Sequence, residues 1–233
     1  MRKLAASAFA VAVTALPLLV IAQTQNPAAL QKACSGGDGR SCFDLAVMYE
    51  GGRHVALDKA KAALLYRKAC DSGSAGGCFA LGLMYRYGKG VAQSKARAAE
   101  LYEKSCIAGS DMGCWSSGRL FDKGDGVAQD KNKAAQLYEK ACDNSYPEAC
   151  HDLGFMYASG DGVTADKARA AELYRKACDG RHAKSCFSLG VLYQNGEGVP
   201  RDKAKATQLN RKACNSRYAD ACKVLERDSR AGQ

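Results

Sequence analysis

The stretch that decides the fold is CFALGLMYRYGKGVAQSKARAAELYEKSCIAGSDMG, which occupies residues 78–113. Variants of it begin at five cysteines spaced 36 residues apart, with no insertion: Cys42, Cys78, Cys114, Cys150 and Cys186. A fixed period of roughly 20 to 50 residues is typical of stacked repeats, each of which buries its apolar face against its neighbours. The sequence therefore predicts five full repeats, at residues 42–77, 78–113, 114–149, 150–185 and 186–221.

Each repeat reads as two helices joined by a glycine-rich turn. The first helix, illustrated by residues 78–87, carries apolar side chains at Leu81, Leu83, Met84 and Tyr85. A Gly-x-Gly-Val turn follows in four repeats, where glycine permits the positive φ that ends a helix. It is not a phosphate-binding loop, because no strand precedes it and no Gly-Lys-Ser/Thr follows it. The second helix begins at a residue that can cap it, namely Asp58, Ser94, Asp130, Asp166 or Asp202.

The twelve cysteines form six identical C-x7-C pairs. Zinc sites favour C-x2-4-C spacing and redox catalysts use C-x-x-C, so neither kind of site is indicated. Within a repeat, Cys42 could meet Cys70, but that scheme leaves Cys34 and Cys222 without partners. Pairing across the turn between repeats uses all twelve. The predicted disulfides are Cys34–Cys42, Cys70–Cys78, Cys106–Cys114, Cys142–Cys150, Cys178–Cys186 and Cys214–Cys222.

The pattern LG-x-MY-x-x-G-x-GV-x-x-D-x-x-KA-x-x-LY-x-KAC, seen over residues 81–106, resembles the Sel1-like repeat, a relative of the tetratricopeptide repeat. The C-x7-C pairs narrow the resemblance to the Helicobacter cysteine-rich proteins. The resemblance covers residues 28–225 and implies an all-α, right-handed α/α superhelical solenoid with disulfide-bridged helices. The sequence departs from the pattern at His54, Ser117 and Asn210, where other repeats have glycine, leucine and tyrosine.

Family members are exported proteins that bind penicillin or slowly hydrolyse β-lactams, interaction scaffolds, or proteins of host contact. The resemblance thus implies either a scaffold or a weak β-lactamase. Because the family has no agreed catalytic motif, no catalytic residue is assigned.

Residues 1–22 are typical of a secretory signal peptide. Arg2 and Lys3 precede an apolar run over residues 4–21, and Ala22 offers a cleavage site. The alternative is an uncleaved membrane anchor, which the polar interruptions in the run disfavour. We therefore expect an exported protein, periplasmic or secreted, with no membrane span after cleavage.

The remaining chain divides simply. Residues 23–27 form a short polar lead, and residues 28–233 form a single solenoid with flanking half-repeats. The apolar pattern fades after Cys222, as expected of a polar capping helix.

Basic residues exceed acidic ones, and loss of Arg2 and Lys3 would lower the formal net charge from +10 to +8. Basic pairs recur at the start of each second helix: Lys59 and Lys61, Lys95 and Arg97, Lys131 and Lys133, Lys167 and Arg169, Lys203 and Lys205. A ridge for anionic cell-wall or membrane polymers is one interpretation. A solvated helix face is favoured, because glutamates are interspersed. Nucleic acid is not expected as a partner, since no basic-aromatic motif is present.

Comparing the repeats with one another separates scaffold from surface. The first, fifth and eighth residues after the cysteine vary most, and this spacing lies on one helical face. Because first helices line the concave side of superhelical repeats, this stripe is the candidate binding surface. The alternative for the aromatic first position is core packing against the disulfide. The stripe consists of Phe43/Val47/Glu50, Phe79/Leu83/Arg86, Trp115/Arg119/Asp122, His151/Phe155/Ala158 and Phe187/Val191/Gln194.

Trp115 and Arg119 are the strongest candidates on the stripe. Trp115 is the only tryptophan, in the central repeat, and arginine can pair with a carboxylate or phosphate in a forked geometry. The predicted ligand-binding residues are Phe79, Arg86, Trp115, Arg119, Asp122, His151 and Phe155. No cofactor or metal is expected.

A binding scaffold needs only this stripe and a rigid stack. Its partner would be a peptide, another protein, or peptidoglycan fragments or β-lactams. The alternative, β-lactam hydrolysis, finds no S-x-x-K, G-x-S-x-G or H-E-x-x-H motif in the sequence. With the cysteines paired there is no thiolate nucleophile. The scaffold is therefore the favoured hypothesis.

Overall fold

The structure, a computed structural model, describes residues 26–231. The predicted signal peptide and residues 23–25 lie outside the described residues. Over the described range the chain forms twelve α-helices and no strand. The first helices of the repeats are α3 (Gly39–Gly51), α5 (Ala75–Tyr87), α7 (Asp111–Lys123), α9 (Pro147–Ser159) and α11 (Ala183–Asn195). The second helices are α4 (Lys59–Asp71), α6 (Lys95–Ile107), α8 (Lys131–Asp143), α10 (Lys167–Asp179) and α12 (Lys203–Asn215). Helices α2 (Pro27–Ser35) and α13 (Ala219–Ala231) flank them.

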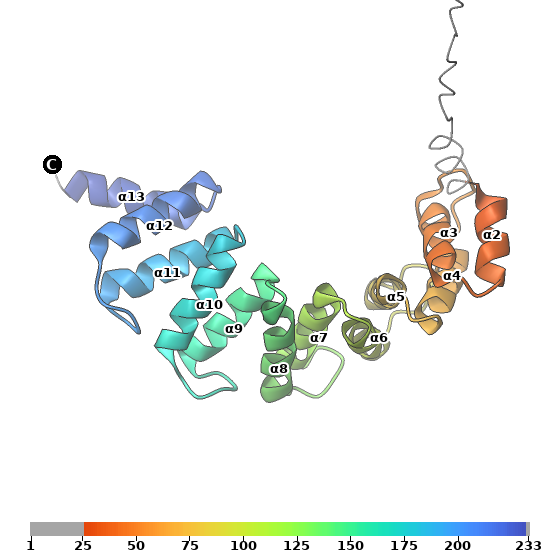
Figure 1. The fold of residues 1–233 in the computed structure, drawn as a ribbon, viewed down its shortest axis with the longest axis horizontal. Coiled ribbons are helices and arrows are strands. Elements are labelled where there is room, and N and C mark those ends of the chain that lie inside the picture. Colours follow the sequence, from red (N-terminus) through yellow and green to blue (C-terminus); the bar gives the residue numbers. More distant parts are fainter. Residues whose placement is uncertain (1–25, 232–233) are drawn as a thin grey trace, which may run out of the picture.

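The helices stack in chain order into an arch, with α2 at one end and α13 at the other (Figure 1). Each helix packs against the helices before and after it, and α5 also contacts α3 and α7 directly. In Figure 1, α5 and α7 lie nearer the inner, upper side of the arch than α6 and α8. The protein is therefore an all-α repeat superhelix, and its first helices face inward in the middle of the arch.

The recurring leucine–glycine pair sets how closely the two helices of a repeat approach. A Cβ atom at Gly82 would lie 2.7 Å from the ring of Tyr102, and one at Gly118 would lie 2.7 Å from the ring of Tyr138. Both tyrosines are almost fully buried. Glycine in the first helix thus makes room for the tyrosine of the second, whose ring is buried in four repeats, while Asn210 takes its place in the fifth.

Capping side chains fix where the helices begin. Asp58 and Asp130 accept hydrogen bonds from the backbone N–H groups of Lys61 and Lys133, as the sequence predicts. The expected start of the first helix at the cysteine is wrong by three residues. Helix α5 begins at Ala75, because Ser74 caps it.

All twelve cysteines are in disulfides, which join the predicted pairs from Cys34–Cys42 to Cys214–Cys222. The Cα atoms of Cys70 and Cys78 lie 4.4 Å apart. Each bond ties a second helix to the first helix that follows it, across the joint on which a one-dimensional stack depends. On a chain-entropy estimate each short loop is worth about 2–3 kcal/mol.

The recurring basic residues also serve the joints. Lys95 pairs with Asp125 at 2.7 Å and Lys167 with Glu197 at 2.7 Å, each ion pair linking one repeat to the turn of the next. In four of the five repeats the second cation of the pair lies over an aromatic ring of its own repeat, as Lys133 does at 4.0 Å from the Phe121 centroid. Much of the basic ridge is thus accounted for by contacts within the scaffold.

Candidate functional site

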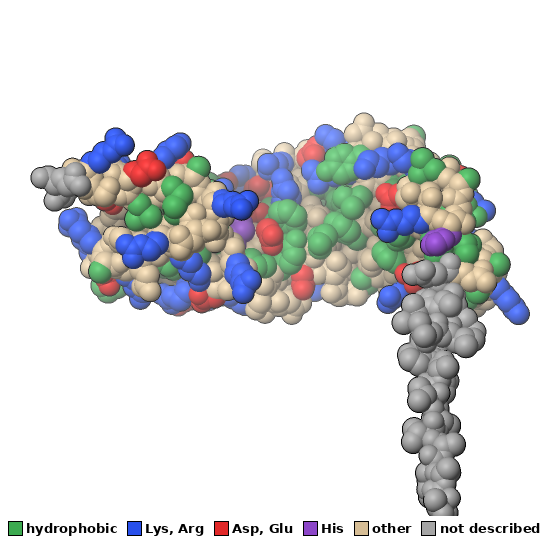
Figure 2. All heavy atoms as spheres, turned by 90° about the horizontal axis from the view of Figure 1, so that it is seen from above, with side chains coloured by type: hydrophobic (Ala, Val, Ile, Leu, Met, Phe, Trp, Pro, Cys, Tyr) green, Lys and Arg blue, Asp and Glu red, His purple; other side chains and the backbone are tan. Residues whose placement is uncertain are grey.

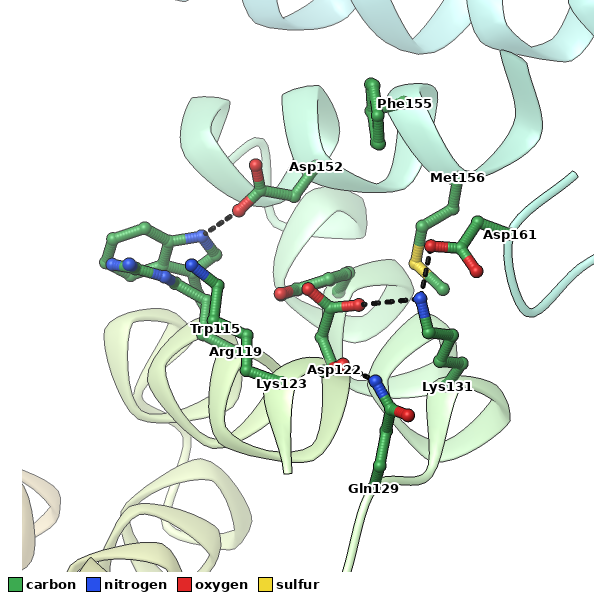
Figure 3. A pocket seen from close by; sticks show the side chains of 11 residues that line it. Trp115, Arg119, Asp122, Lys123, Gln129, Lys131, Asp152, Phe155, Met156 and Asp161 are labelled. Carbon is green, nitrogen blue, oxygen red and sulfur yellow. Dashed lines mark hydrogen bonds and ion pairs between the residues drawn. The ribbon is translucent and has the colours of Figure 1, made fainter. Parts of the chain in front are cut away.

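A cavity of about 490 Å³ lies between the third and fourth repeats (Figure 3). Its volume is within the range of ligand-binding pockets. The residues that line it are Trp115, Arg119, Asp122, Lys123, Gln129, Lys131, Tyr138, Asp152, Phe155, Met156 and Asp161. They come from α7, α8 and α9 and from the turns that follow α7 and α9.

Trp115 is held in place by the next repeat. Its indole Nε1–H donates to Asp152 Oδ2 at 2.8 Å, and its ring lies 5.8 Å from that of Tyr146. The Arg119 guanidinium lies 4.9 Å above the indole ring. Burial raises the pKa of Asp152, against the opposing effects of the Trp115 hydrogen bond and the Arg119 charge. This side of the cavity is a preorganised aromatic and cationic surface.

The other side of the cavity is an ion-pair cluster. Lys131 Nζ pairs with Asp161 and lies 3.9 Å from Asp122 Oδ1. The hydrogen bond to Asp161 raises the pKa of Lys131. Gln129 donates from Nε2 to the backbone carbonyl of Asp122 at 2.7 Å. These carboxylates therefore already have partners inside the protein.

Two cations of the cavity have no such partner. Within residues 26–231, neither Arg119 nor Lys123 makes an ion pair or a side-chain hydrogen bond. Figure 3 shows both on the Trp115 side, away from Lys131 and Asp161. Phe155 is 57% exposed and lines the same space. The cavity thus offers free positive charge beside exposed apolar area, which suits a group carrying a carboxylate and an apolar neighbour.

The structure brings together four of the seven predicted ligand-binding residues: Trp115, Arg119, Asp122 and Phe155. Phe79 is half-buried and packs against the Tyr102 ring at 5.3 Å, which is the core packing considered as the alternative. Arg86 belongs to the preceding repeat, where it lies 5.7 Å from the Tyr87 centroid. Neither Phe79 nor Arg86 lines the cavity.

His151 is buried, with 5% of its surface exposed, whereas the sequence suggested an exposed side chain. Its Nδ1 lies 2.8 Å from Ser185 Oγ, which is also 2.8 Å from Nδ1 of His182. The two imidazole rings are 4.7 Å apart. Burial, then the nearby His182 and Lys184, lower the pKa of His151 to about 3. It joins α9 to Ser185 and His182 of the following joint and does not line the cavity.

Sequence reasoning missed Asp152, Lys131 and Asp161. In the sequence Lys131 is one of many cations on a helix face that reads as solvated. Asp152 lies 37 residues from the tryptophan that it binds, so the contact exists only after the repeats stack. The one usable signal is that the second residue after the cysteine varies among Asp44, Ala80, Ser116, Asp152 and Ser188.

Nothing in residues 26–231 groups three histidine, cysteine, aspartate or glutamate side chains in a way that could hold a metal ion. The same part of the chain has no helix long and apolar enough to cross a membrane.

A model of the Sel1 repeat matches five segments of the chain, at residues 39–74, 75–110, 112–146, 147–182 and 183–218. The protein belongs to the Sel1 repeat family. With six disulfides between adjacent helices it is a disulfide-rich Sel1-like repeat protein. None of the curated proteins compared with it is similar to it.

Two solved structures show the same architecture. A protective antigen of uropathogenic Escherichia coli, c5321, superposes with a TM-score of 0.78 at 30% identity, covering 82% of this chain and 41% of its own. This chain therefore spans less than half the length of that antigen. A Sel1 repeat protein from Oxalobacter formigenes gives a TM-score of 0.74 at 27% identity, with 89% and 86% coverage. Cysteine-rich protein B of Helicobacter pylori is 32% identical over 58% of this chain and 98% of its own, with a TM-score of 0.46.

Two conclusions follow, one from the family and one from the disulfides. Sel1 repeat proteins typically bind proteins, so this chain has the fold of an interaction scaffold. Six disulfides are typical of a protein that folds in an oxidising, exported compartment.

Proposed function

We propose that this Sel1 repeat protein is an exported scaffold that binds an extended peptide segment of a partner protein along its inner face. Residues 1–22 would act as its signal peptide, and the periplasm or the exterior would be its destination. The principal contact would be the cavity between α7 and α9. The unpaired Arg119 beside an anchored Trp115 is the observation that carries the proposal.

The physical support is preorganisation. Trp115 is fixed by Asp152, and Arg119 is stacked on Trp115, so little side-chain freedom is lost when a ligand binds. Tryptophan and arginine are also the side chains that most often dominate protein interfaces. A scaffold that presents them on a disulfide-linked stack needs no catalytic group.

The test uses the single tryptophan as a reporter, because all tryptophan emission comes from Trp115. Random twelve-residue peptides would be selected on the oxidised protein and then titrated while emission is recorded. Selected peptides should shift the emission and lose at least about tenfold in affinity with Arg119→Ala. Arg211→Ala, at an exposed position on α12, is the matched control. Peptides that bind Arg119→Ala as tightly as the unmodified protein would place binding elsewhere and refute the proposal.

The β-lactamase alternative finds no support in this cavity. Its lining contains no serine, cysteine or histidine. Burial raises the pKa of Tyr138, so its phenol is neutral and a poor nucleophile. We expect no turnover of a chromogenic cephalosporin by the oxidised protein. Turnover that survives further purification and falls in a Trp115→Ala, Arg119→Ala double variant would favour the enzyme instead.

A further inference from the structure

The cavity is one step in a longer row of side chains on the inner face. The fifth residue after the cysteine is apolar in four repeats: Val47, Leu83, Phe155 and Val191. Val47 is 40% exposed and Val191 37%, while Leu83 is half-buried. Seen from above the arch, apolar side chains gather over its middle (Figure 2). Arg119 occupies the same position in the central repeat, so the row is apolar except for one cation.

The spacing of this row fits an extended chain. Helix α5 contacts both α3 and α7 directly, and the axes of packed helices lie about 8–10 Å apart. A polyproline II helix rises about 3.1 Å per residue with three residues per turn, or roughly 9 Å per turn. One side chain of such a peptide can therefore face each repeat, at every third residue.

The charges of the cavity determine which side chain of the peptide can face the central repeat. Asp122 and Asp161 are engaged by Lys131, and Asp152 by the indole of Trp115. Arg119 and Lys123, one helical turn apart on α7, lack such partners within the described residues. A ligand with a negative charge would therefore pair with these two cations, and a guanidinium binds a carboxylate through paired hydrogen bonds.

We propose that the ligand is an extended peptide with one acidic residue flanked, three residues away on each side, by apolar residues. Its carboxylate lies against Arg119 and Lys123, and its apolar side chains pack on Leu83 and Phe155. This inference rests on the proposed function and names the class of peptide that the same face accepts.

The test uses nine-residue peptides, acetylated and amidated to remove their terminal charges. Proline fills all positions except leucine at the second and eighth and glutamate at the fifth. One control peptide has glutamine at the fifth position, and another carries the glutamate at the sixth. Binding is followed by Trp115 emission and by anisotropy of a labelled peptide. The glutamate peptide should bind about tenfold or more tightly than either control.

Charge reversal sharpens the test. Arg119→Glu should bind the glutamate peptide most weakly of the set and prefer a peptide with lysine at the fifth position. Arg211→Glu, on the exposed face of α12, should keep the original preference. Circular dichroism checks that both variants fold.

Equal binding of the glutamate and glutamine peptides, or no binding of the glutamate peptide at about 1 mM, would overturn the inference. The proposed function is judged separately by the selected random peptides. If these bind at Trp115 but lack an acidic residue with apolar residues three positions away on each side, the proposed function is supported and the proposed peptide class is wrong. If they bind away from Trp115, both are wrong.

Discussion

The turns between repeats differ between the first and second halves of the chain. The residue four positions before the first cysteine of each repeat ends the turn, and the residue before it has positive φ. The turns that lead into α3, α5 and α7 read Gly37–Asp38, Gly73–Ser74 and Gly109–Ser110. Those that lead into α9, α11 and α13 read Ser145–Tyr146, Arg181–His182 and Arg217–Tyr218.

The two halves hold the same joint by different means. In the first half glycine adopts the positive φ without a Cβ penalty, and a side chain caps the next helix, as Ser74 does. In the second half a non-glycine residue takes that conformation, and Tyr146 and His182 give no side-chain cap. Instead an aromatic ring packs on the preceding repeat, as Tyr218 does on Phe187 at 5.3 Å.

The comparison shows what a repeat protein gains by giving up a cap. A cap stabilises only its own helix, whereas the aromatic ring reaches the neighbouring repeat. The cavity lies at the first joint of the aromatic kind, where Tyr146 packs on Trp115. The change in turn chemistry therefore coincides with the place where a side chain has to be fixed for binding.

The largest expected effect concerns the disulfides, which occur at the joints of both halves. Reduction of the six disulfides should lower the melting temperature sharply, since each closes a short loop worth about 2–3 kcal/mol. Circular dichroism melting with and without reductant measures it, and a thiol titration confirms reduction. An unchanged melting curve after confirmed reduction would contradict a stapling role.

Matched pairs of variants compare the halves directly. Replacing Cys70 and Cys78 with alanine tests the glycine joint, and replacing Cys142 and Cys150 tests the aromatic joint. If the aromatic contact also stabilises its joint, the second pair should lose less stability than the first. An equal or larger loss at the aromatic joint would contradict this expectation.

The next largest effect is the loss of stability in acid, which we expect to arise from His151 in the second half. The pKa of His151 is lowered to about 3, so below pH 6.5 the unfolded chain takes up a proton that the folded protein does not. The contribution of neutral His151 to the free energy of unfolding is therefore fully present above about pH 6.5, and it is lost as the pH falls toward 3. His151→Phe, which restores the aromatic residue of Phe43 and Phe79, should remove about 3 kcal/mol of the loss between pH 7 and pH 4.

Urea unfolding at the two pH values measures this difference. Ser185 keeps His182 as a partner in the variant, so stability at pH 7 should change little. An equally steep loss in His151→Phe would mean that another group, such as His182, dominates the acid response.

The fold could be predicted from the sequence because the fold is periodic. Repeated Leu-Gly and Tyr positions encode the packing of Tyr102 on Gly82, and the C-x7-C spacing encodes every disulfide. The site could be predicted only in part, because it depends on departures from the repeat. Trp115 and Arg119 are visible as departures, whereas Asp152 shows its role only when two repeats face each other. In the sequence His151 takes the stripe position of the half-buried Phe79 and Trp115, but in the structure it is buried and the ring of His182 lies against it.

A smaller effect tests the glycine turns. Gly73 has φ of 84°, and no atom lies within 4 Å of the position that a Cβ would occupy, so substitution there changes only the backbone preference. Gly73→Ala should destabilise the protein by about 1 kcal/mol, measured by urea unfolding. Gly76→Ala is a control of another kind, because a Cβ there would meet the Phe43 ring at 3.3 Å. No loss in Gly73→Ala would mean that the turn tolerates any residue, as the second half already does.

The smallest effect runs in the opposite direction. Ser145 has φ of 66°, a conformation that costs a non-glycine residue roughly 1 kcal/mol. Ser145→Gly relieves that cost but loosens the unfolded chain, so the net gain should be a few tenths of a kcal/mol. Serine at this position would then act by making the turn rigid, so that Tyr146 stays packed on Trp115. If so, Ser145→Gly should raise the unfolding midpoint slightly while weakening peptide binding at Trp115. A variant that gains stability and loses no affinity would show that the second-half turns are tolerated rather than required.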